Sequence, residues 1–101
     1  GRADNTLTVG PLTLDTATRS ATRDGKEIKL TAKEYSILEY LMRNQGVVLS
    51  RDKIEQHIWN YDYTGSSNVI DVYIRTLRKK IDADFDVKLI QTVRGMGYVI
   101  K

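Results

Sequence analysis

Cysteine is absent from this chain of 101 residues, and histidine and proline each occur once. Without cysteine, the protein has no disulfide framework, no Cys-ligated zinc finger and no thiol nucleophile. His57 has neither a nucleophile at a meaningful spacing nor ligand partners, so we expect it on a helix surface or half-buried. No apolar run approaches the roughly 18 residues of a membrane span. These absences predict a non-enzymatic protein of the reducing cytoplasm, with no metal, no cofactor and no membrane segment.

The chain has the size of one domain, and its 41% hydrophobic and 29% charged residues are typical of a folded protein. We expect one domain over residues 6–101, with residues 1–5 as a linker or a remnant of a longer polypeptide. The net charge of +3 is uneven, because residues 75–101 carry seven Lys or Arg against three Asp. A basic C-terminal third favours a polyanionic partner such as nucleic acid. An ordinary solvated face is the alternative.

Residues 6–30 are expected to form short strands, because Leu7 and Val9, and then Leu12 and Leu14, alternate with polar residues. Gly10-Pro11 is a turn signal, and Asp24-Gly25 is a strong signal for a two-residue hairpin. The pattern predicts a four-stranded antiparallel sheet.

After Leu30 the apolar period changes from 2 to 3.6, and Thr31 and Glu34 form the pattern of a capping box. This first helix should stop near Gly46, and a second should begin after the N-cap Ser50 and end around Trp59. A third helix is expected over residues 68–81, where isoleucine and leucine recur at helical spacing on one face. These are Ile70, Ile74, Leu77 and Ile81.

The last segments, 88–93 and 98–101, are rich in Val, Ile and Tyr and flank a turn over 94–97, so we expect a closing hairpin.

The acidic stretch from Asp82 to Asp86 imitates the start of an EF-hand loop. Such a loop needs Gly at its sixth position and Glu at its twelfth, where this chain has Val87 and Val93. We therefore interpret the stretch as a solvated turn.

The order of the expected elements predicts a helix-turn-helix with a wing: two helices, a loop, a third helix with a basic outer face, and a hairpin. A helix fits the major groove, where short polar or basic side chains meet base edges. Arg94 at the hairpin tip suits a narrow minor groove, whose negative potential attracts arginine. The alternative is a three-helix core whose third helix only has a solvated basic face.

Four segments of the sequence resemble the OmpR/PhoB family. Residues 69–81 (VIDVYIRTLRKKI) are similar to its recognition helix, and residues 89–98 (LIQTVRGMGY) to its wing. Residues 30–34 (LTAKE), and Leu49 to Arg51 followed by Ile58 and Trp59, match its first two helices. The resemblance covers residues 6–101 and implies an α+β winged helix: an N-terminal four-stranded antiparallel sheet, three helices and a C-terminal β-hairpin.

The resemblance implies sequence-specific binding of double-stranded DNA, and it assigns roles by position. In the third helix, positions facing the major groove and its flanking phosphates are Arg75, Thr76, Arg78 and Lys79, with Asn68, Val72 and Tyr73 on the approach side. Outside it, phosphate contacts correspond to Arg51, Trp59, Thr92 and Tyr98, and the minor-groove arginine corresponds to Arg94. Some members carry Arg at the positions of Asn68 and Thr76, which leaves the base preference open.

The resemblance also implies a larger system. Members are output domains of bacterial two-component response regulators, controlled by phosphorylation of a receiver domain that this chain lacks. It implies a sensor histidine kinase as partner of that receiver and dimers on tandem half-sites. In some members the segment corresponding to residues 60–67 contacts RNA polymerase, which here would involve Tyr61, Asp62 and Tyr63; packing of one of these tyrosines on the core is the alternative. A winged helix that binds only proteins is the main rival function, but it should show apolar residues where this chain has Arg75 and Lys79. A hydrolase fails for want of a nucleophile–base pair.

Overall fold

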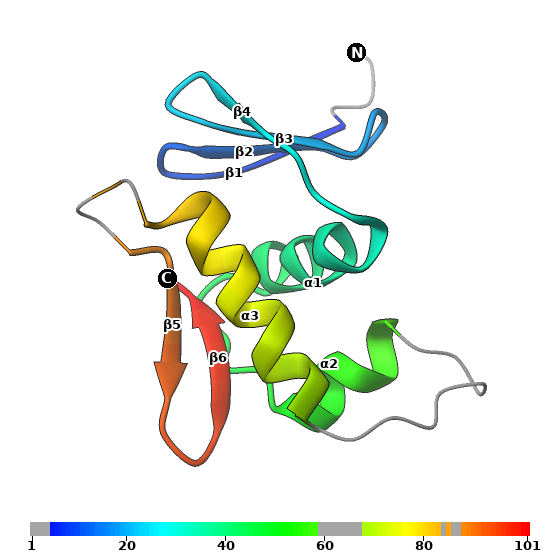
Figure 1. Ribbon diagram of the computed structural model, residues 1–101, viewed down its shortest axis with the longest axis vertical. Helices are drawn as coiled ribbons and strands as arrows, with labels where there is room; N and C mark the ends of the chain where they lie inside the picture. Colours follow the sequence, from blue (N-terminus) through cyan, green and yellow to red (C-terminus); the bar gives the residue numbers. More distant parts are fainter. Residues whose placement is uncertain (1–4, 59–67, 84, 86–87) are drawn as a thin grey trace.

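The computed structural model describes residues 5–58, 68–83, 85 and 88–101. Its elements run along the chain in the order of the predicted winged helix (Figure 1). The strands are β1 (Thr6–Val9), β2 (Leu12–Asp15), β3 (Ser20–Arg23), β4 (Lys26–Ile28), β5 (Ile90–Val93) and β6 (Gly97–Ile100). The helices are α1 (Ala32–Arg43), α2 (Arg51–Ile58) and α3 (Asn68–Ile81). None of the helices in these residues is long and apolar enough to cross a membrane.

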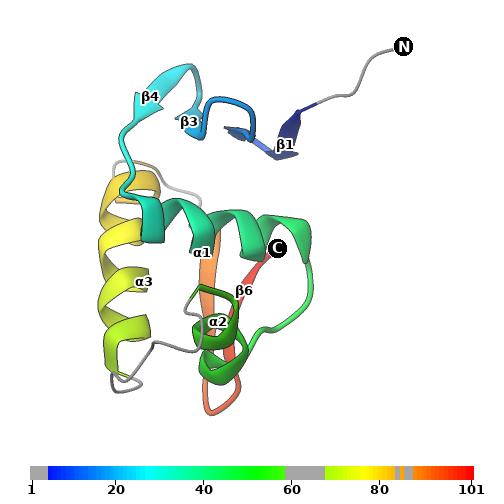
Figure 2. The ribbon, with the colours of Figure 1, turned by 90° about the vertical axis from the view of Figure 1, so that its right-hand side faces the viewer.

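The predicted N-terminal sheet is confirmed as four antiparallel strands in the order β1-β2-β3-β4. Asp24 and Gly25 both adopt positive φ (54° and 82°), as the two central residues of a type I′ hairpin turn do. The alternating apolar side chains, such as Leu12, Leu14 and Ala21, are buried on one face. That face lies over α1, as the two perpendicular views show (Figures 1 and 2).

The predicted caps start the first two helices. At α1, the Thr31 hydroxyl accepts the Glu34 backbone N–H, and the Glu34 carboxylate accepts the Thr31 N–H, which completes the capping box. At α2, the Ser50 hydroxyl accepts the Lys53 N–H at 3.1 Å. Gly46 has the expected positive φ of 84° beyond the end of α1. Local polar residues therefore fix where the helices begin and end.

The C-terminal hairpin, β5 and β6, is the wing, and one residue of the link before α2 pairs with it close to its turn. Leu49, expected in an extended link, pairs with Tyr98 through two backbone hydrogen bonds of 2.8 and 2.9 Å. A side chain at Gly97 would place its Cβ 2.0 Å from the Leu49 carbonyl oxygen, so only glycine allows this close approach. The link before α2 and the wing are thus joined backbone to backbone.

The interpretation of Asp82 as part of a solvated turn is wrong. Asp82 is 2% exposed and forms an ion pair of 2.7 Å with Arg23, which is 1% exposed. The same carboxylate accepts the backbone N–H groups of Leu89 and Ile90 at 3.0 and 3.1 Å. Two charges can be buried here because each finds its partner and further hydrogen bonds. Asp82 therefore ties the N-terminal sheet to the start of the wing.

Candidate nucleic-acid interface

Helix α3 has one apolar face and one polar face, as its sequence predicts. The apolar stripe from Ile70 to Ile81 is buried against the core, with every member at 1% exposure or less. On the other side of the helix, Arg75 and Lys79 are exposed, Thr76 is half-buried, and Val72 is 55% exposed. A large apolar residue among cations on an open face is available for contact with a partner.

The wing stands beside α3, at the opposite end of the molecule from the N-terminal sheet (Figure 1). Thr92 on β5 and Arg94 in the turn are both exposed. The turn is narrow because Gly95 adopts a positive φ of 76°, and its exposed apolar residue is Met96. A slender tip that carries the exposed cation of Arg94 has the shape and charge to enter a groove.

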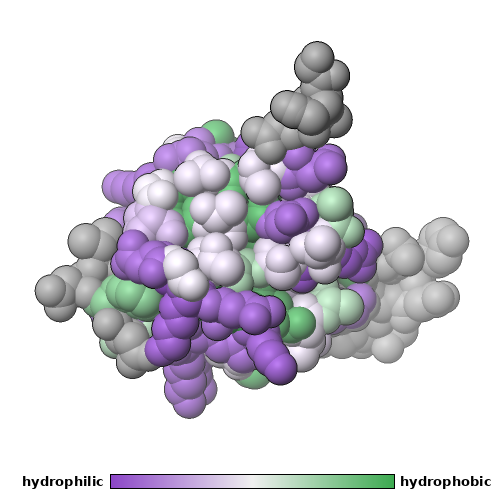
Figure 3. Space-filling view, turned by 90° about the horizontal axis from the view of Figure 1, so that it is seen from above, coloured by the Kyte–Doolittle hydropathy of each residue, from purple (hydrophilic) through white to green (hydrophobic). Residues whose placement is uncertain are grey.

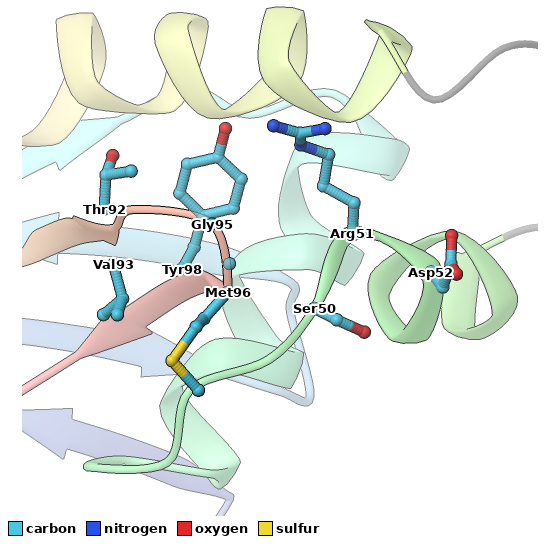
Figure 4. Close-up of a pocket in the computed structure, with 9 residues that line it drawn as sticks. Ser50, Arg51, Asp52, Thr92, Val93, Gly95, Met96 and Tyr98 are labelled. Carbon is cyan, nitrogen blue, oxygen red and sulfur yellow. The ribbon is translucent and has the colours of Figure 1, made fainter.

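The start of α2 lies next to both elements. A cleft of about 290 Å³ separates it from the wing. Figure 4 shows the Arg51 and Tyr98 side chains near this cleft, both directed towards α3. The Arg51 guanidinium meets the Asp71 carboxylate of α3 at 3.1 Å, yet about half of the arginine side chain stays exposed. Arg51 thus combines a link to α3 with an accessible positive charge.

Tyr98 joins the wing to α3 through its hydroxyl. The residue is 7% exposed, and its hydroxyl donates a hydrogen bond to the Asp71 carboxylate. Burial raises the pKa of the Tyr98 phenol, and the bond to the carboxylate raises this pKa further. The phenol therefore stays protonated and remains a hydrogen-bond donor at neutral pH.

Arg78 makes a second link between α3 and the wing. Its Nε donates to the Ile90 carbonyl at 3.3 Å, and its Nη2 donates to the Thr92 hydroxyl. The guanidinium carbon also lies 5.7 Å from the centroid of the Tyr98 ring. Part of the arginine's hydrogen-bonding capacity is thereby used inside the protein.

The structure brings most of the expected site residues onto one surface formed by α3, the wing and the start of α2. The exposed or partly exposed members are Arg51, Val72, Tyr73, Arg75, Thr76, Arg78, Lys79, Thr92 and Arg94. Of these, Tyr73 is half-buried and packs against the core. Trp59, Tyr61, Asp62 and Tyr63 lie outside the described residues, and for Asn68 only the backbone, which opens α3, is described.

Asp71 is the residue of this surface that sequence reasoning missed. Its position in the first turn of α3 is ordinary for an acid, because carboxylates are favourable at helix N-termini. Its partners Arg51 and Tyr98 are distant in the chain, so no local pattern predicts the contact.

The part of the chain that the structure describes contains no group of three or more His, Asp or Glu side chains that could hold a metal ion.

The outer face of the N-terminal sheet has a different chemistry. Its strands present small hydroxyl side chains, namely Thr6, Thr8, Thr13, Ser20 and Thr22. Figure 3 views this end from above and shows pale side chains of intermediate hydropathy, with purple hydrophilic ones around them. The exposed α3 cations and the wing tip thus lie away from this hydroxyl-rich face.

Comparison with known proteins agrees with this architecture. Residues 25–100 match the family described as "Transcriptional regulatory protein, C terminal". The chain is 50% identical over 99 residues to the transcriptional regulatory protein TrcR of Mycobacterium tuberculosis, covering 98% of this chain and 38% of that protein. The chain therefore spans about two fifths of the length of that curated relative.

Solved structures give the same fold. DrrB of Thermotoga maritima, an OmpR/PhoB homolog, superposes with a TM-score of 0.86 at 32% identity, covering 96% of this chain and 44% of that one. The DNA-binding domain of Klebsiella pneumoniae RstA, in complex with the RstA box, superposes with a TM-score of 0.82 at 29% identity. That match covers 96% of this chain and 97% of the RstA chain.

Fold and surface together define a winged-helix DNA-binding domain. The chain belongs to the family of C-terminal domains of transcriptional regulatory proteins, as a DNA-binding output domain of an OmpR/PhoB-type two-component response regulator.

Proposed function

We propose that this domain reads a specific duplex by placing the outer face of α3 in the major groove and Arg94 in the adjacent minor groove. The observation that carries the proposal is the exposure of Arg75, Lys79 and Arg94 on one surface formed by α3 and the wing. DNA affinity comes largely from cations that neutralise phosphates, whereas specificity comes from contacts with base edges. Both kinds of side chain are present on this surface.

Base contacts are assigned to Val72 and Thr76, one helical turn apart. The Thr76 hydroxyl donates to the Val72 carbonyl at 3.1 Å, so its proton is already used within the helix. The Thr76 methyl and the exposed Val72 side chain then form a small apolar patch between cations. Apolar side chains recognise the C5-methyl group of thymine in the major groove. We therefore expect a preference for thymine opposite this turn of α3.

The remaining positions serve affinity. We assign phosphate contacts to Arg75, Lys79 and Thr92, and a further one to Arg51 at the start of α2. Arg78 contributes charge to the same surface while it holds the wing. From the resemblance, we keep Asn68 and Tyr73 as proposed members on the approach side of α3, and Trp59 as a further proposed phosphate contact.

The full-length protein is proposed to work as its relatives' names indicate, as a transcription regulator. In this scheme a receiver domain is phosphorylated by a sensor histidine kinase, and the protein then dimerises on tandem half-sites. The segment with Tyr61, Asp62 and Tyr63 is a proposed contact with RNA polymerase. Such a protein needs no catalysis in this domain, and it acts where the chromosome lies, in the bacterial cytoplasm.

The test is binding of variants to duplex DNA as the salt concentration varies. If four to six phosphates are neutralised, log K should fall with log[salt] with a slope of roughly −4 to −5. Lys79→Ala should weaken binding to all duplexes alike and reduce the slope by about one. Arg94→Ala should cost most on sites with A·T-rich flanks, where the minor groove is narrowest.

Lys29→Ala provides the control, because Lys29 is an exposed cation that follows β4 at the other end of the molecule. This variant should bind like the unmodified protein at every salt concentration. A flat salt response, or an equal loss from Lys29→Ala and Lys79→Ala, would refute the proposed surface. An equal loss from Arg94→Ala with both kinds of flank would reassign that residue to a general phosphate contact.

A further inference from the structure

The wing and α3 are joined by polar side chains at two levels. Near the N-terminal end of α3, Asp71 receives the Tyr98 hydroxyl and the Arg51 guanidinium. Two turns further along, Arg78 donates to the Ile90 carbonyl and the Thr92 hydroxyl. The two elements proposed to enter neighbouring grooves are therefore braced against each other before any DNA is present.

The Tyr98 hydroxyl is the informative group, because a hydroxyl has a single proton to donate. A phosphate oxygen can only accept a hydrogen bond, so a direct contact with phosphate needs that proton. In the structure the proton is donated to Asp71, and the ring beneath it is buried. Tyr98 therefore cannot donate to a phosphate while it holds Asp71.

We propose that Tyr98 and Asp71 are positioning residues, which act on DNA recognition by fixing the wing relative to α3. This inference rests on the proposed function, because it acts through Arg94. A two-stranded hairpin is only marginally stable on its own, so its tip needs anchoring from outside the hairpin. Two contacts made by Tyr98, next to the turn, supply this anchoring: its backbone pairs with Leu49, and its hydroxyl bonds to Asp71 of α3. A wing already held in place loses less conformational freedom on binding.

This assignment differs measurably from a direct phosphate contact by Tyr98. A direct contact contributes to affinity whatever happens at Arg94, so losses from the two residues would add. A positioning role is felt through Arg94, so removal of Arg94 should also remove most of the effect of Tyr98. Residues that act through one another are non-additive in a double-mutant cycle, whereas independent ones add.

The first experiment is such a cycle, with Tyr98→Phe, Arg94→Ala and the double variant measured on one duplex with A·T flanks. Tyr98→Phe keeps the ring and removes only the hydroxyl, and it should weaken binding about three- to tenfold. In the Arg94→Ala background the same change should cost less than about twofold. Additive losses, or no loss from Tyr98→Phe alone, would overturn the proposal.

The second experiment uses the free protein and does not depend on DNA. Backbone ¹⁵N relaxation should show greater mobility over residues 93–97 in Tyr98→Phe than in the unmodified protein, and Asp71→Ala should reproduce this change. Tyr40→Phe, which alters a tyrosine of α1, and Arg94→Ala are the controls and should leave the wing as it is. A wing of unchanged mobility in both Tyr98→Phe and Asp71→Ala would overturn the proposal.

The two experiments separate this inference from the function on which it rests. If Arg94→Ala does not weaken binding, the proposed role of the wing in DNA binding fails. The free-protein measurement still decides whether Tyr98 and Asp71 hold the wing.

Discussion

Replacing Gly97 by alanine tests how the wing is attached to the body of the domain. Gly97 has a φ of +145°, and an added Cβ would lie 2.0 Å from the Leu49 carbonyl oxygen and 2.9 Å from the Ser50 Cα. Cβ atoms essentially never approach other atoms within 3.0 Å, so the strand must retreat by about 1 Å. Because the obstacle is backbone, no side-chain rotation can relieve it.

The expected cost follows from what this retreat breaks. The two backbone hydrogen bonds between Leu49 and Tyr98, at 2.8 and 2.9 Å, contribute about 1 kcal/mol each. Positive φ at a residue with a side chain adds about 1–2 kcal/mol. Gly97→Ala should therefore lower the free energy of unfolding by about 3–4 kcal/mol, a large part of the stability of a domain of this size.

Gly95→Ala is the matched control in the same turn. Gly95 also has a positive φ, of 76°, but an added Cβ meets nothing within 4 Å. Its cost should be confined to the backbone conformation, about 1–2 kcal/mol. Urea unfolding followed by circular dichroism measures both variants under one set of conditions. If Gly97→Ala costs no more than Gly95→Ala, the close contact with Leu49 does not hold the wing.

Three further predictions concern buried charge, pH and base preference. Asp82→Ala leaves Arg23 without its buried partner and should lower the free energy of unfolding by about 3–5 kcal/mol. Loss of the partly exposed Glu39–Arg43 pair should cost under about 1 kcal/mol in the same urea titration. Burial acts to raise the pKa of Glu34, but the bonds from Lys80 and Thr31 prevail and lower this pKa below its ordinary 4.5. The stabilisation from the Glu34 carboxylate is therefore complete above pH 4.5 and is lost as the pH falls through the pKa of Glu34 in the folded protein. Glu34→Gln should accordingly flatten the acid side of a profile of stability against pH, and an unchanged profile would contradict this. Thr76→Val should keep the preference for thymine and Thr76→Ser should lose it in a duplex-binding series, and the reverse result would mean that the hydroxyl makes the contact.

Local sequence signals account for most of the fold. The hairpin turn at Asp24 and Gly25 and the capping box of Thr31 and Glu34 are each complete within four residues, and the structure has both. The bounds of α3 agree with the predicted 68–81, because its apolar period runs without interruption between polar loops. Such features need no knowledge of the rest of the chain.

Contacts between distant polar residues could not be predicted in this way. Arg23 and Asp82 are 59 positions apart, and Asp71 and Tyr98 are 27 apart, so no period or motif relates them. Acidic residues are mostly exposed, which is why the sequence around Asp82 predicts a solvated turn. The alternation of β3 carried a weak signal, since it places Arg23 on the same face as the buried Ala21.

For the site, sequence and resemblance indicated which side chains are available, and the structure adds what they are already bound to. Exposed positions such as Arg75 and Lys79 follow directly from the helical period of α3. The engagement of Arg78 with Thr92 does not, because it depends on how the wing folds back beside the helix. Those internal bonds are what separate the proposed positioning residues from the proposed contacts.

A titration of the ¹⁵N-labelled domain with a selected duplex tests the central claim most directly, because the amide signals report which face of the protein meets DNA. Large shifts are expected for residues of α3 from Val72 to Lys79 and for the wing turn around Arg94. The sheet positions Thr8, Thr13 and Thr22, at the opposite end of the molecule, should stay unchanged. Shifts concentrated on those sheet residues, with α3 and the wing unaffected, would contradict the account.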